Sequence, residues 1–316
     1  LIKMKLTKSE LNTISNQYNL GKIISIKLMR KGVVNYNFDA KTDRGEVIIR
    51  IMGYKLDEHN KKKKELEFKI LNFLKENNFP YEIPVPIKNK SNNYLSRINE
   101  KNIWVYKKII GDRVKKLNKE QIKEIAKALA TYHKFIYKFK DYSNINRDET
   151  WILNKFSEMR KVESNNKINK LVLDKIDFIE KSYLEIKKDF NENIIVNHSD
   201  FHKHNVLFQG NKVVAILDFD NLKIAPRAKD ISYAIRAISI KNSKLNNRTM
   251  NLFIKEYEKI WPLSKKEKQM IIPYMIIDRC IVFWWFYEGM KKKKHKKYEY
   301  MLDSVNIIKN LQKQLH

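Results

Sequence analysis

The chain has 316 residues, of which 43% are apolar or aromatic, so it can bury a sizeable core, which excludes simple disorder and favours two lobes or domains. Its 65 Lys and Arg against 36 Asp and Glu give a formal net charge of +29, which by itself would suggest nucleic acid, an anionic membrane or phosphate-rich substrates. Lys, Asn and Ile are over-used along the whole chain, whereas a nucleic-acid-binding protein concentrates its charge on one element, so we do not expect a nucleic-acid partner.

The N-terminal third is predicted to form a small sheet. Thr7 and Glu10 make a capping-box pattern, which predicts a short opening helix. Three β-rich runs separated by turn residues then predict a three-stranded meander over residues 23–28, 33–40 and 46–52. Residues 1–6 contain no apolar stretch of signal-peptide length, so we do not expect export.

The apolar period then changes to that of a helix over residues 58–74. The apolar face of this helix is made of Leu66, Ile70, Leu71 and Leu74. The lysine run at residues 61–64 is expected to be solvated. The apolar stretches 94–98 and 103–109 complete a predicted five-stranded antiparallel sheet, and we place the first domain at residues 1–108.

After Gly111 the chain becomes mainly helical, and we place a second, larger domain at residues 109–316. Asn118 can cap the first helix of this domain. Only residues 194–217 return to β character. Within them the turn residues 209–211 separate two apolar runs, which predicts a hairpin.

The most apolar segment, residues 270–290, is predicted to be a buried helix. The apolar run is interrupted by one proline and three charged residues: Pro273, Asp278, Arg279 and Glu288. A charge at mid-bilayer costs roughly 2.5 to 3.5 kcal/mol even on the lenient insertion scale, so we do not expect a membrane span. Cys280 is expected in the core, and as the single cysteine it excludes an intramolecular disulfide and favours a reducing cytoplasm. The sequence leaves the oligomeric state open.

The residues that can carry chemistry gather around the hairpin. Asp200 and Asn205 precede it, and Asp218 follows it. Because a hairpin returns the chain close to its start, these three residues should converge. Phosphoryl transfer uses such a trio: one carboxylate orients and deprotonates the attacking hydroxyl, while an amide oxygen and a second carboxylate hold Mg²⁺ on the nucleotide phosphates.

These motifs resemble a known superfamily. H-x-D-x-x-x-x-N from His198 to Asn205, D-x-D at Asp218, and a proline followed by Asp230 are together similar to the aminoglycoside phosphotransferase and choline kinase-like superfamily, relatives of the protein kinases. Within it, GVVNYNF, EVIIRI and DRCIVFWWF resemble the homoserine kinase-like branch. The likeness runs from about residue 23 to about residue 289. It implies an α+β, protein-kinase-like two-lobed fold, with a nucleotide-binding lobe followed by a catalytic and substrate-binding lobe.

The resemblance also implies roles for single residues. Asp200 becomes the catalytic base, supported by His198, and Asn205 and Asp218 become the ligands of Mg²⁺. The expected co-substrate is ATP or GTP. The further supporting positions are Asp220 and Asp230.

In the first lobe, Arg50 occupies the place where protein kinases have their phosphate-pairing lysine. Arginine keeps the positive charge of lysine and can donate two parallel hydrogen bonds. We therefore expect phosphate binding to be retained although the lysine is replaced. Glu67 best fits the helix carboxylate that pairs with this cation, because it precedes Leu74 by the family's seven residues, and Glu65 is the alternative.

The remaining nucleotide contacts are weaker matches. Gly32 and Asn35 form a phosphate turn with one glycine, shorter than the G-x-G-x-x-G loop of many kinases. Tyr106 and Lys107 match the family's hinge, where main-chain groups meet the adenine edge, and an ordinary sheet edge is the alternative for both.

The acceptor is expected to be a small hydroxylated metabolite, because Asp218 and Pro226 are only eight residues apart and leave little room to present a peptide. From Asp230 onward, 18 Lys and Arg face 8 Asp and Glu, whereas a polycationic aminoglycoside would need a surplus of carboxylates. We therefore favour a homoserine-like amino alcohol or a sugar, with Arg279 as a contact for an acceptor carboxylate. His202 is expected on the substrate side.

Other functions stay open at this point. Choline or ethanolamine is the alternative acceptor, supported by the aromatic run at residues 283–287 and by Asp278, and an aminoglycoside is a further one. His198, His202 and His204 with Asp200 could form a zinc loop, although this leaves the D-x-D motif unexplained. A catalytically silent scaffold or a nucleic-acid-binding protein should lack Mg²⁺-dependent nucleotide binding.

Overall fold

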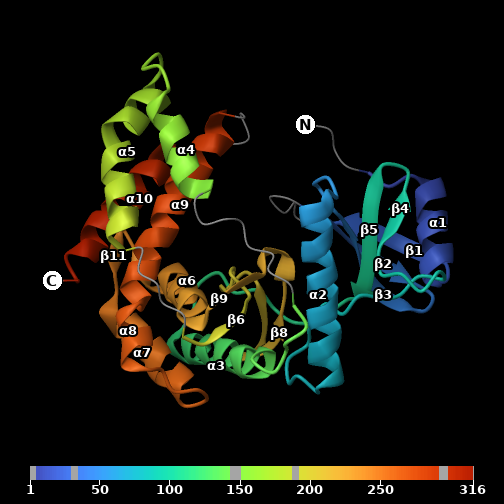
Figure 1. The fold of residues 1–316 in the computed structure, drawn as a ribbon. Helices are drawn as coiled ribbons and strands as arrows, with labels where there is room; N and C mark the ends of the chain where they lie inside the picture. The colour runs from blue at the N-terminus through green and yellow to red at the C-terminus, as the bar shows by residue number, and fades with distance from the viewer. Residues whose placement is uncertain (1–4, 30–34, 143–150, 187–191, 292–297, 316) are drawn as a thin grey trace. The chain divides into compact units, whose positions relative to one another are not determined.

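The computed structural model describes residues 5–29, 35–142, 151–186, 192–291 and 298–315 (Figure 1). The chain divides into two compact units. The first comprises Leu1–Arg113, Phe139–Tyr142 and Val206–Asp220, and the second comprises Val114–Lys138, Ser143–Asn205 and Asn221–His316.

The first unit contains a five-stranded antiparallel sheet of order β1-β2-β3-β5-β4, which confirms the predicted α+β class. Its strands are β1 (Ile23–Leu28), β2 (Tyr36–Thr42), β3 (Gly45–Ile51), β4 (Ser96–Ile98) and β5 (Lys101–Lys107). Helix α1 (Lys8–Tyr18) begins with the predicted capping box of Thr7 and Glu10. Helix α2 (Glu58–Glu76) begins at the residue that the apolar period predicted.

Side-chain alternation along β3 decides which residues meet each helix. Ile49 and Ile51 belong to the core under α1, which includes Ile14. Ile48 packs with Phe68 of α2 and with Trp104 of β5. Arg50, two residues after Ile48 and opposite Trp104 in the sheet register, therefore shares the face that carries α2.

The predicted hairpin is present as β7 (Val206–Gln209) and β8 (Lys212–Ile216), and it belongs to the first unit. Phe208 exchanges two backbone hydrogen bonds with Asp112, of 2.8 and 2.9 Å. A glycine is required at Gly111, because a Cβ there would lie 2.8 Å from Cβ of Leu207. This close approach joins the hairpin to the end of the segment that carries the sheet.

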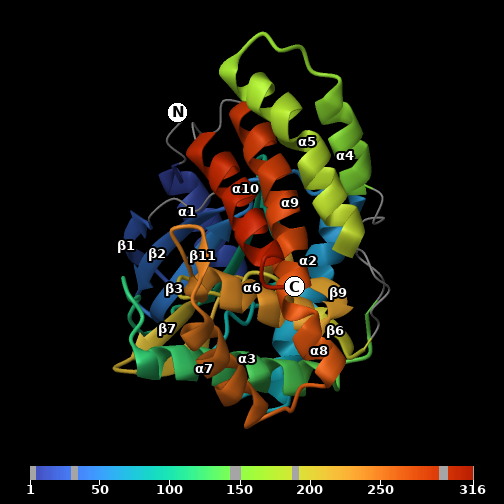
Figure 2. The ribbon, with the colours of Figure 1, turned by 90° about the vertical axis from the view of Figure 1, so that its left-hand side faces the viewer.

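The second unit is mainly helical (Figure 2). Its helices are α3 (Lys119–Ile136), α4 (Trp151–Arg160), α5 (Lys167–Ile186), α6 (Arg227–Ser239), α7 (Asn247–Glu258), α8 (Lys265–Gln269), α9 (Ile271–Lys291) and α10 (Tyr298–Gln312). Asn118 caps α3, as predicted, and α9 packs against α5, α6 and α10. Two short strand pairs accompany them: β6 (Ile194–Asn197) with β9 (Lys223–Pro226), and β10 (Ile240–Lys241) with β11 (Lys244–Leu245).

Helix α9 is the predicted buried helix. Cys280 is buried in the core, as expected, and so are three members of the aromatic run: Phe283, Phe286 and Tyr287. Core packing therefore accounts for most of that run. Within the part of the chain that the structure describes, no helix is both long enough and apolar enough to cross a membrane.

Glu10 makes the first unit sensitive to acid. Burial alone would raise the pKa of this carboxyl, but Lys101 at 2.5 Å, the backbone N–H of Thr7 and the amide of Asn99 lower it from 4.5 to about 2. Because the folded pKa lies below the unfolded one, this stabilisation is complete above about pH 4.5 and is lost as the pH falls toward 2.

We therefore expect Glu10→Gln to lower the free energy of unfolding at pH 7 by roughly 1 to 3 kcal/mol, and to reduce its pH dependence between about 4.5 and 2. Urea unfolding at a series of pH values measures both effects. The matched control is Glu100→Gln, because the Glu100 side chain is 91% exposed in its pair with Arg97. Equal acid sensitivity in wild type and Glu10→Gln would contradict this assignment.

Candidate active site

In the first unit, the D-x-D motif that follows β8 meets the cation of β3. Nη2 of Arg50 lies 2.9 Å from Oδ1 of Asp218 and also pairs with Asp220. Asn35 donates a 2.6 Å hydrogen bond from its side-chain amide to Asp220. Asp218 has a φ of 66°, in the left-handed region that is uncommon for a non-glycine residue and is found at functional sites.

The partner predicted for Arg50 is corrected by the structure. Among the described residues, Glu67 makes its ion pair with Lys64, at 2.5 Å and one helical turn away, whereas Arg50 pairs with the two aspartates. Lys64 also pairs with Asp220 at 2.7 Å, so Asp220 joins the two cations. Glu65, the alternative to Glu67, is exposed.

Lys64 also corrects the expectation that the lysine run is solvated. Lys61 and Lys62 are exposed, but Lys64 is only 3% exposed and lies over the ring of Trp104. A buried ammonium is stable only beside opposite charge. Asp220 and Glu67 supply that charge, and they raise the pKa of Lys64 although burial alone would lower it.

The pKa directions in this cluster follow from burial and pairing. Burial raises the pKa of Asp218, with Arg50 opposing and Asp220 adding to the rise. Burial alone would also raise the pKa of Asp220, but Arg50 and Lys64 bring it well below its usual value. Burial raises the pKa of Glu67 to about 7 against the effect of Lys64. Asp218 is the more accessible aspartate, with 39% of its side chain exposed against 14% for Asp220.

In the second unit, Asp200 lies in the loop after β6, and both of its carboxylate oxygens accept hydrogen bonds. The Tyr233 hydroxyl donates to Oδ1 at 2.5 Å, and the Asn205 amide donates to Oδ2 at 3.0 Å and to the Asp200 carbonyl at 2.9 Å. Nε2 of His202 lies 3.4 Å from Oδ1. Because the nitrogen of the Asn205 amide is engaged, its oxygen remains for a cation.

Asp230, at the start of α6, holds the loop that carries Asp200. Its carboxylate accepts hydrogen bonds from the backbone N–H groups of His198, at 2.7 Å, and Ser199, at 2.9 Å. Nε2 of His133 lies 3.0 Å from the same carboxylate, and Nδ1 of His198 accepts from the Asp200 N–H at 3.3 Å. This is the placement that an anchor of the catalytic loop requires.

The other predicted nucleotide contacts have different outcomes. Gly32 lies outside the described residues. The Tyr106 side chain is buried in the sheet, where burial raises its pKa to about 12, and Lys107 is exposed. Their main-chain role at a hinge stays a prediction.

The zinc loop finds no support. His202 lies beside Asp200, but within the described ranges no three His, Cys, Asp or Glu side chains come together as metal ligands. Burial lowers the pKa of His202, although Asp200 opposes the shift, so its imidazole is neutral at pH 7.

Three residues of this region were missed by sequence reasoning. Lys64 carried a usable signal, because it precedes Glu67 by three residues on one helical face. Tyr233 and Arg236 carried none, since a tyrosine and an arginine in an amphipathic helix are ordinary. Their partners come from other segments of the chain.

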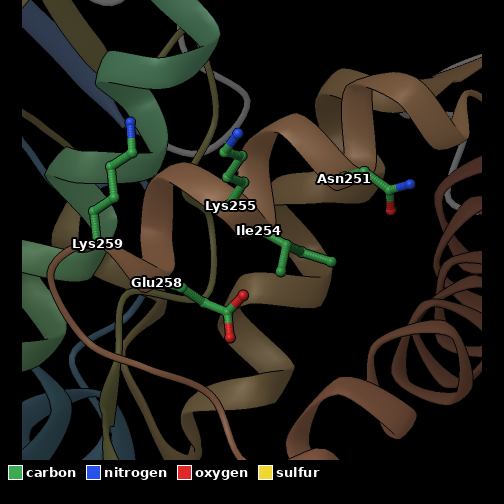
Figure 3. Close-up of a pocket in the computed structure, with 5 residues that line it drawn as sticks. All are labelled: Asn251, Ile254, Lys255, Glu258 and Lys259. Atoms are coloured by element: carbon green, nitrogen blue, oxygen red, sulfur yellow. The ribbon is translucent and has the colours of Figure 1, made fainter.

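A separate surface pocket of about 410 Å³ lies on α7 (Figure 3). It is lined by Asn251, Ile254, Lys255, Glu258 and Lys259. All five side chains project from α7 or its C-terminal end, and none belongs to the predicted site.

Comparison with known proteins supports the resemblance. The model of the phosphotransferase enzyme family matches residues 25–251. Homoserine kinases of Agrobacterium fabrum and Methylobacillus flagellatus are 24% and 22% identical to the chain, and each alignment covers 84% of this chain and 80% of the relative.

Solved structures of low sequence identity share the fold. An amicoumacin kinase in complex with AMP-PNP and Ca²⁺ has a TM-score of 0.72 and 13% identity, over 97% of this chain and 93% of that one. A microcompartment-associated aminopropanol kinase has a TM-score of 0.71 and 12% identity, over 96% of this chain and 97% of that one. The kinase-like fold predicted from the motifs is thereby confirmed.

Proposed function

Because the chain belongs to the phosphotransferase enzyme family, we propose that it transfers the γ-phosphoryl group of a nucleoside triphosphate to the hydroxyl of a small metabolite, with homoserine as the favoured acceptor. The observation that carries this proposal is the pairing of Asp218 with Arg50. It places a carboxylate suited to a metal ion beside a guanidinium suited to phosphate oxygens.

We further propose that Asp200, Asn205 and Asp218 serve one reaction, as their spacing in the sequence predicts. Val206 directly follows Asn205, and it pairs across the hairpin with Ile216, two residues before Asp218. Directly opposed residues of antiparallel strands have Cα atoms about 4.5 to 5.5 Å apart. Hairpin register thus sets the end of β8, which leads to Asp218, beside the start of β7, which follows Asn205 in the sequence.

The donor set fits Mg²⁺. The carboxylate of Asp218 and the amide oxygen of Asn205 are hard oxygen ligands, and Mg²⁺ takes few protein ligands while retaining water. When bound, Mg²⁺ would neutralise charge on the nucleotide phosphates. Asp200 would orient the acceptor hydroxyl and take its proton, while Arg50 and Lys64 would face phosphate oxygens.

The nucleotide is proposed to be ATP. The amicoumacin kinase of similar fold is in complex with AMP-PNP, which supports a nucleotide co-substrate and favours adenine. GTP stays an alternative, because a structure of another neighbour contains GDP and kanamycin.

Homoserine is favoured by two independent observations. The homoserine kinases align along most of their length with this chain. The second is the excess of basic residues from Asp230 onward, which disfavours a polycationic aminoglycoside. The choline alternative is weakened, because Phe283, Phe286 and Tyr287 are buried in the core.

The proposal is tested by ADP release from ATP with a panel of acceptors: homoserine, sugars, choline, ethanolamine and an aminoglycoside. We expect homoserine to give the highest kcat/KM, and we expect chelation of divalent cations with EDTA to abolish turnover. Efficient phosphorylation of the aminoglycoside, with the other acceptors inert, would overturn the choice of acceptor. ADP release that survives EDTA would contradict the metal assignment.

A further inference from the structure

Three charged side chains meet between α6 and α9 of the second unit, and their charges do not cancel. Nε of Arg236 lies 2.8 Å from Oδ2 of Asp278, and Arg279 donates two hydrogen bonds to the same oxygen, at 3.1 and 2.9 Å. The exposed fractions of the three side chains are between 11% and 24%. Two guanidinium groups thus share one carboxylate in a largely buried place.

This arrangement leaves hydrogen-bonding capacity unused. Nε of Arg236 is buried and completes no hydrogen bond, because its contact with Asp278 has unsuitable angles. Among the described residues, no acceptor is hydrogen-bonded to either Nη atom of Arg236 or to Nη1 of Arg279, and no donor is hydrogen-bonded to Oδ1 of Asp278. Of these atoms only Nε of Arg236 is fully buried, where an unused donor is costly, and the others are accessible to a partner from outside the chain.

Other arginines of the unit are paired differently. Arg227 forms an ion pair with Glu267. Arg160 forms ion pairs with two carboxylates, those of Asp177 and Glu180. Among the described residues, neither of these arginines shares its carboxylates with a second cation. The surplus guanidinium beside Asp278 therefore indicates an anionic ligand.

Tyr233 connects this cluster to the base. The guanidinium of Arg236 lies 4.4 Å from the centre of the Tyr233 ring, and the Tyr233 hydroxyl donates to Asp200. Burial raises the pKa of Tyr233, and the charge of Asp200 raises it further. One tyrosine side chain therefore contacts both Arg236 of the cluster and Asp200.

We propose that Arg236, Arg279 and Asp278 form the subsite for the zwitterionic head group of the acceptor, an α-amino acid with a side-chain hydroxyl. The free N–H groups of the two arginines bind the α-carboxylate, and Oδ1 of Asp278 accepts from the α-ammonium. The hydroxyl at the other end of the molecule then faces Asp200. This inference rests on the proposed function and adds the residues that select the acceptor.

Two truncated acceptors test the subsite in the wild-type enzyme. Compared with homoserine, 3-aminopropan-1-ol lacks the carboxylate and 4-hydroxybutyrate lacks the ammonium group. We expect kcat/KM for each to be roughly 10- to 100-fold lower, the effect of losing a hydrogen-bonded charge. Turnover of homoserine together with equal turnover of both truncated acceptors would overturn the subsite and leave the proposed kinase function intact.

Variants then assign the effect to residues. Arg236→Met and Arg279→Met should each reduce the preference for homoserine over 3-aminopropan-1-ol by roughly 10- to 100-fold. Arg160→Met, the same change at an exposed pair of this unit, should leave the preference unchanged. Circular dichroism and Tm verify folding, and Arg279→Lys, which keeps the charge without the fork, should lose part of the preference.

These experiments distinguish failure of the proposed subsite from failure of the favoured acceptor. An unchanged preference in folded Arg236→Met and Arg279→Met would overturn the subsite alone. Absence of ADP release with homoserine and both truncated acceptors, while another hydroxyl compound is turned over, would overturn the favoured acceptor and the subsite together. If a methionine variant does not fold, the truncated acceptors in the wild-type enzyme still decide the question.

Discussion

Replacement of Asp200 by alanine is expected to lower kcat by roughly 10²- to 10⁴-fold, the loss expected when a general base is removed. In the second unit its carboxylate is oriented by hydrogen bonds from Tyr233 and Asn205, and the loop beneath it is held by Asp230. Nucleotide affinity should stay close to that of the wild type, because Arg50 and Asp218 are untouched. Steady-state kinetics with homoserine and titration with Mg²⁺ and ADP measure the two effects separately.

The matched control for this change is Asp177→Ala. Asp177 lies in the same unit, pairs with Arg160 and is 85% exposed, so its removal should leave kcat unchanged. Full phosphotransfer by a folded Asp200→Ala enzyme would show that another group accepts the proton.

Replacement of Asp218 by alanine should have a different signature. We expect kcat to fall and the increase in nucleotide affinity on addition of Mg²⁺ to disappear, because a hard oxygen ligand is lost. Metal-free ADP should bind at least as tightly as to the wild type, since Arg50 is released from its 2.9 Å contact and one negative charge near the phosphates is removed. Calorimetric titration of ADP with and without Mg²⁺ measures this difference.

Asp39→Ala is the control for Asp218→Ala. Asp39 lies on β2 of the same unit and forms a 2.8 Å ion pair with Lys108 at the surface. Its removal should change neither the metal dependence nor kcat. An unaltered effect of Mg²⁺ on ADP affinity in Asp218→Ala would remove Asp218 from the metal site.

Much of the fold could be predicted because local signals agreed with one another. The strand at residues 23–28, the helix beginning at Glu58 and the cap at Asn118 all rest on periodicity or capping patterns, which short stretches of chain contain in full. Strand β9 was missed, because its residues Lys223–Pro226 include a proline and alternate poorly. Its partner β6 lies 26 or more residues earlier, so no local pattern indicates the pairing.

In the candidate site too, local sequence patterns could be predicted, whereas contacts between distant segments could not. Asp200, Asn205 and Asp218 could be proposed from the sequence because their spacing around a hairpin is itself the signal, and their shared role stays a prediction. The partner of Glu67 could not be chosen correctly, because Lys64 and Arg50 are both plausible cations and only the packing of α2 on the sheet decides between them. Nothing in the sequence was a reason to select Arg236. It becomes a candidate ligand-binding residue only because it shares the carboxylate of Asp278 with Arg279.

The hairpin β7–β8 has a consequence for how the protein emerges from the ribosome. Residues Val206–Asp220 complete the first unit. The ribosome adds about ninety residues after Arg113 before it begins this segment. At typical rates of translation this interval is roughly 5 to 20 s. During that time the backbone groups of Asp112 and Glu82 lack the hairpin to which they are later hydrogen-bonded. The first unit is therefore complete only once Asp220 has been added, and until then the nascent chain exposes this unit without its hairpin.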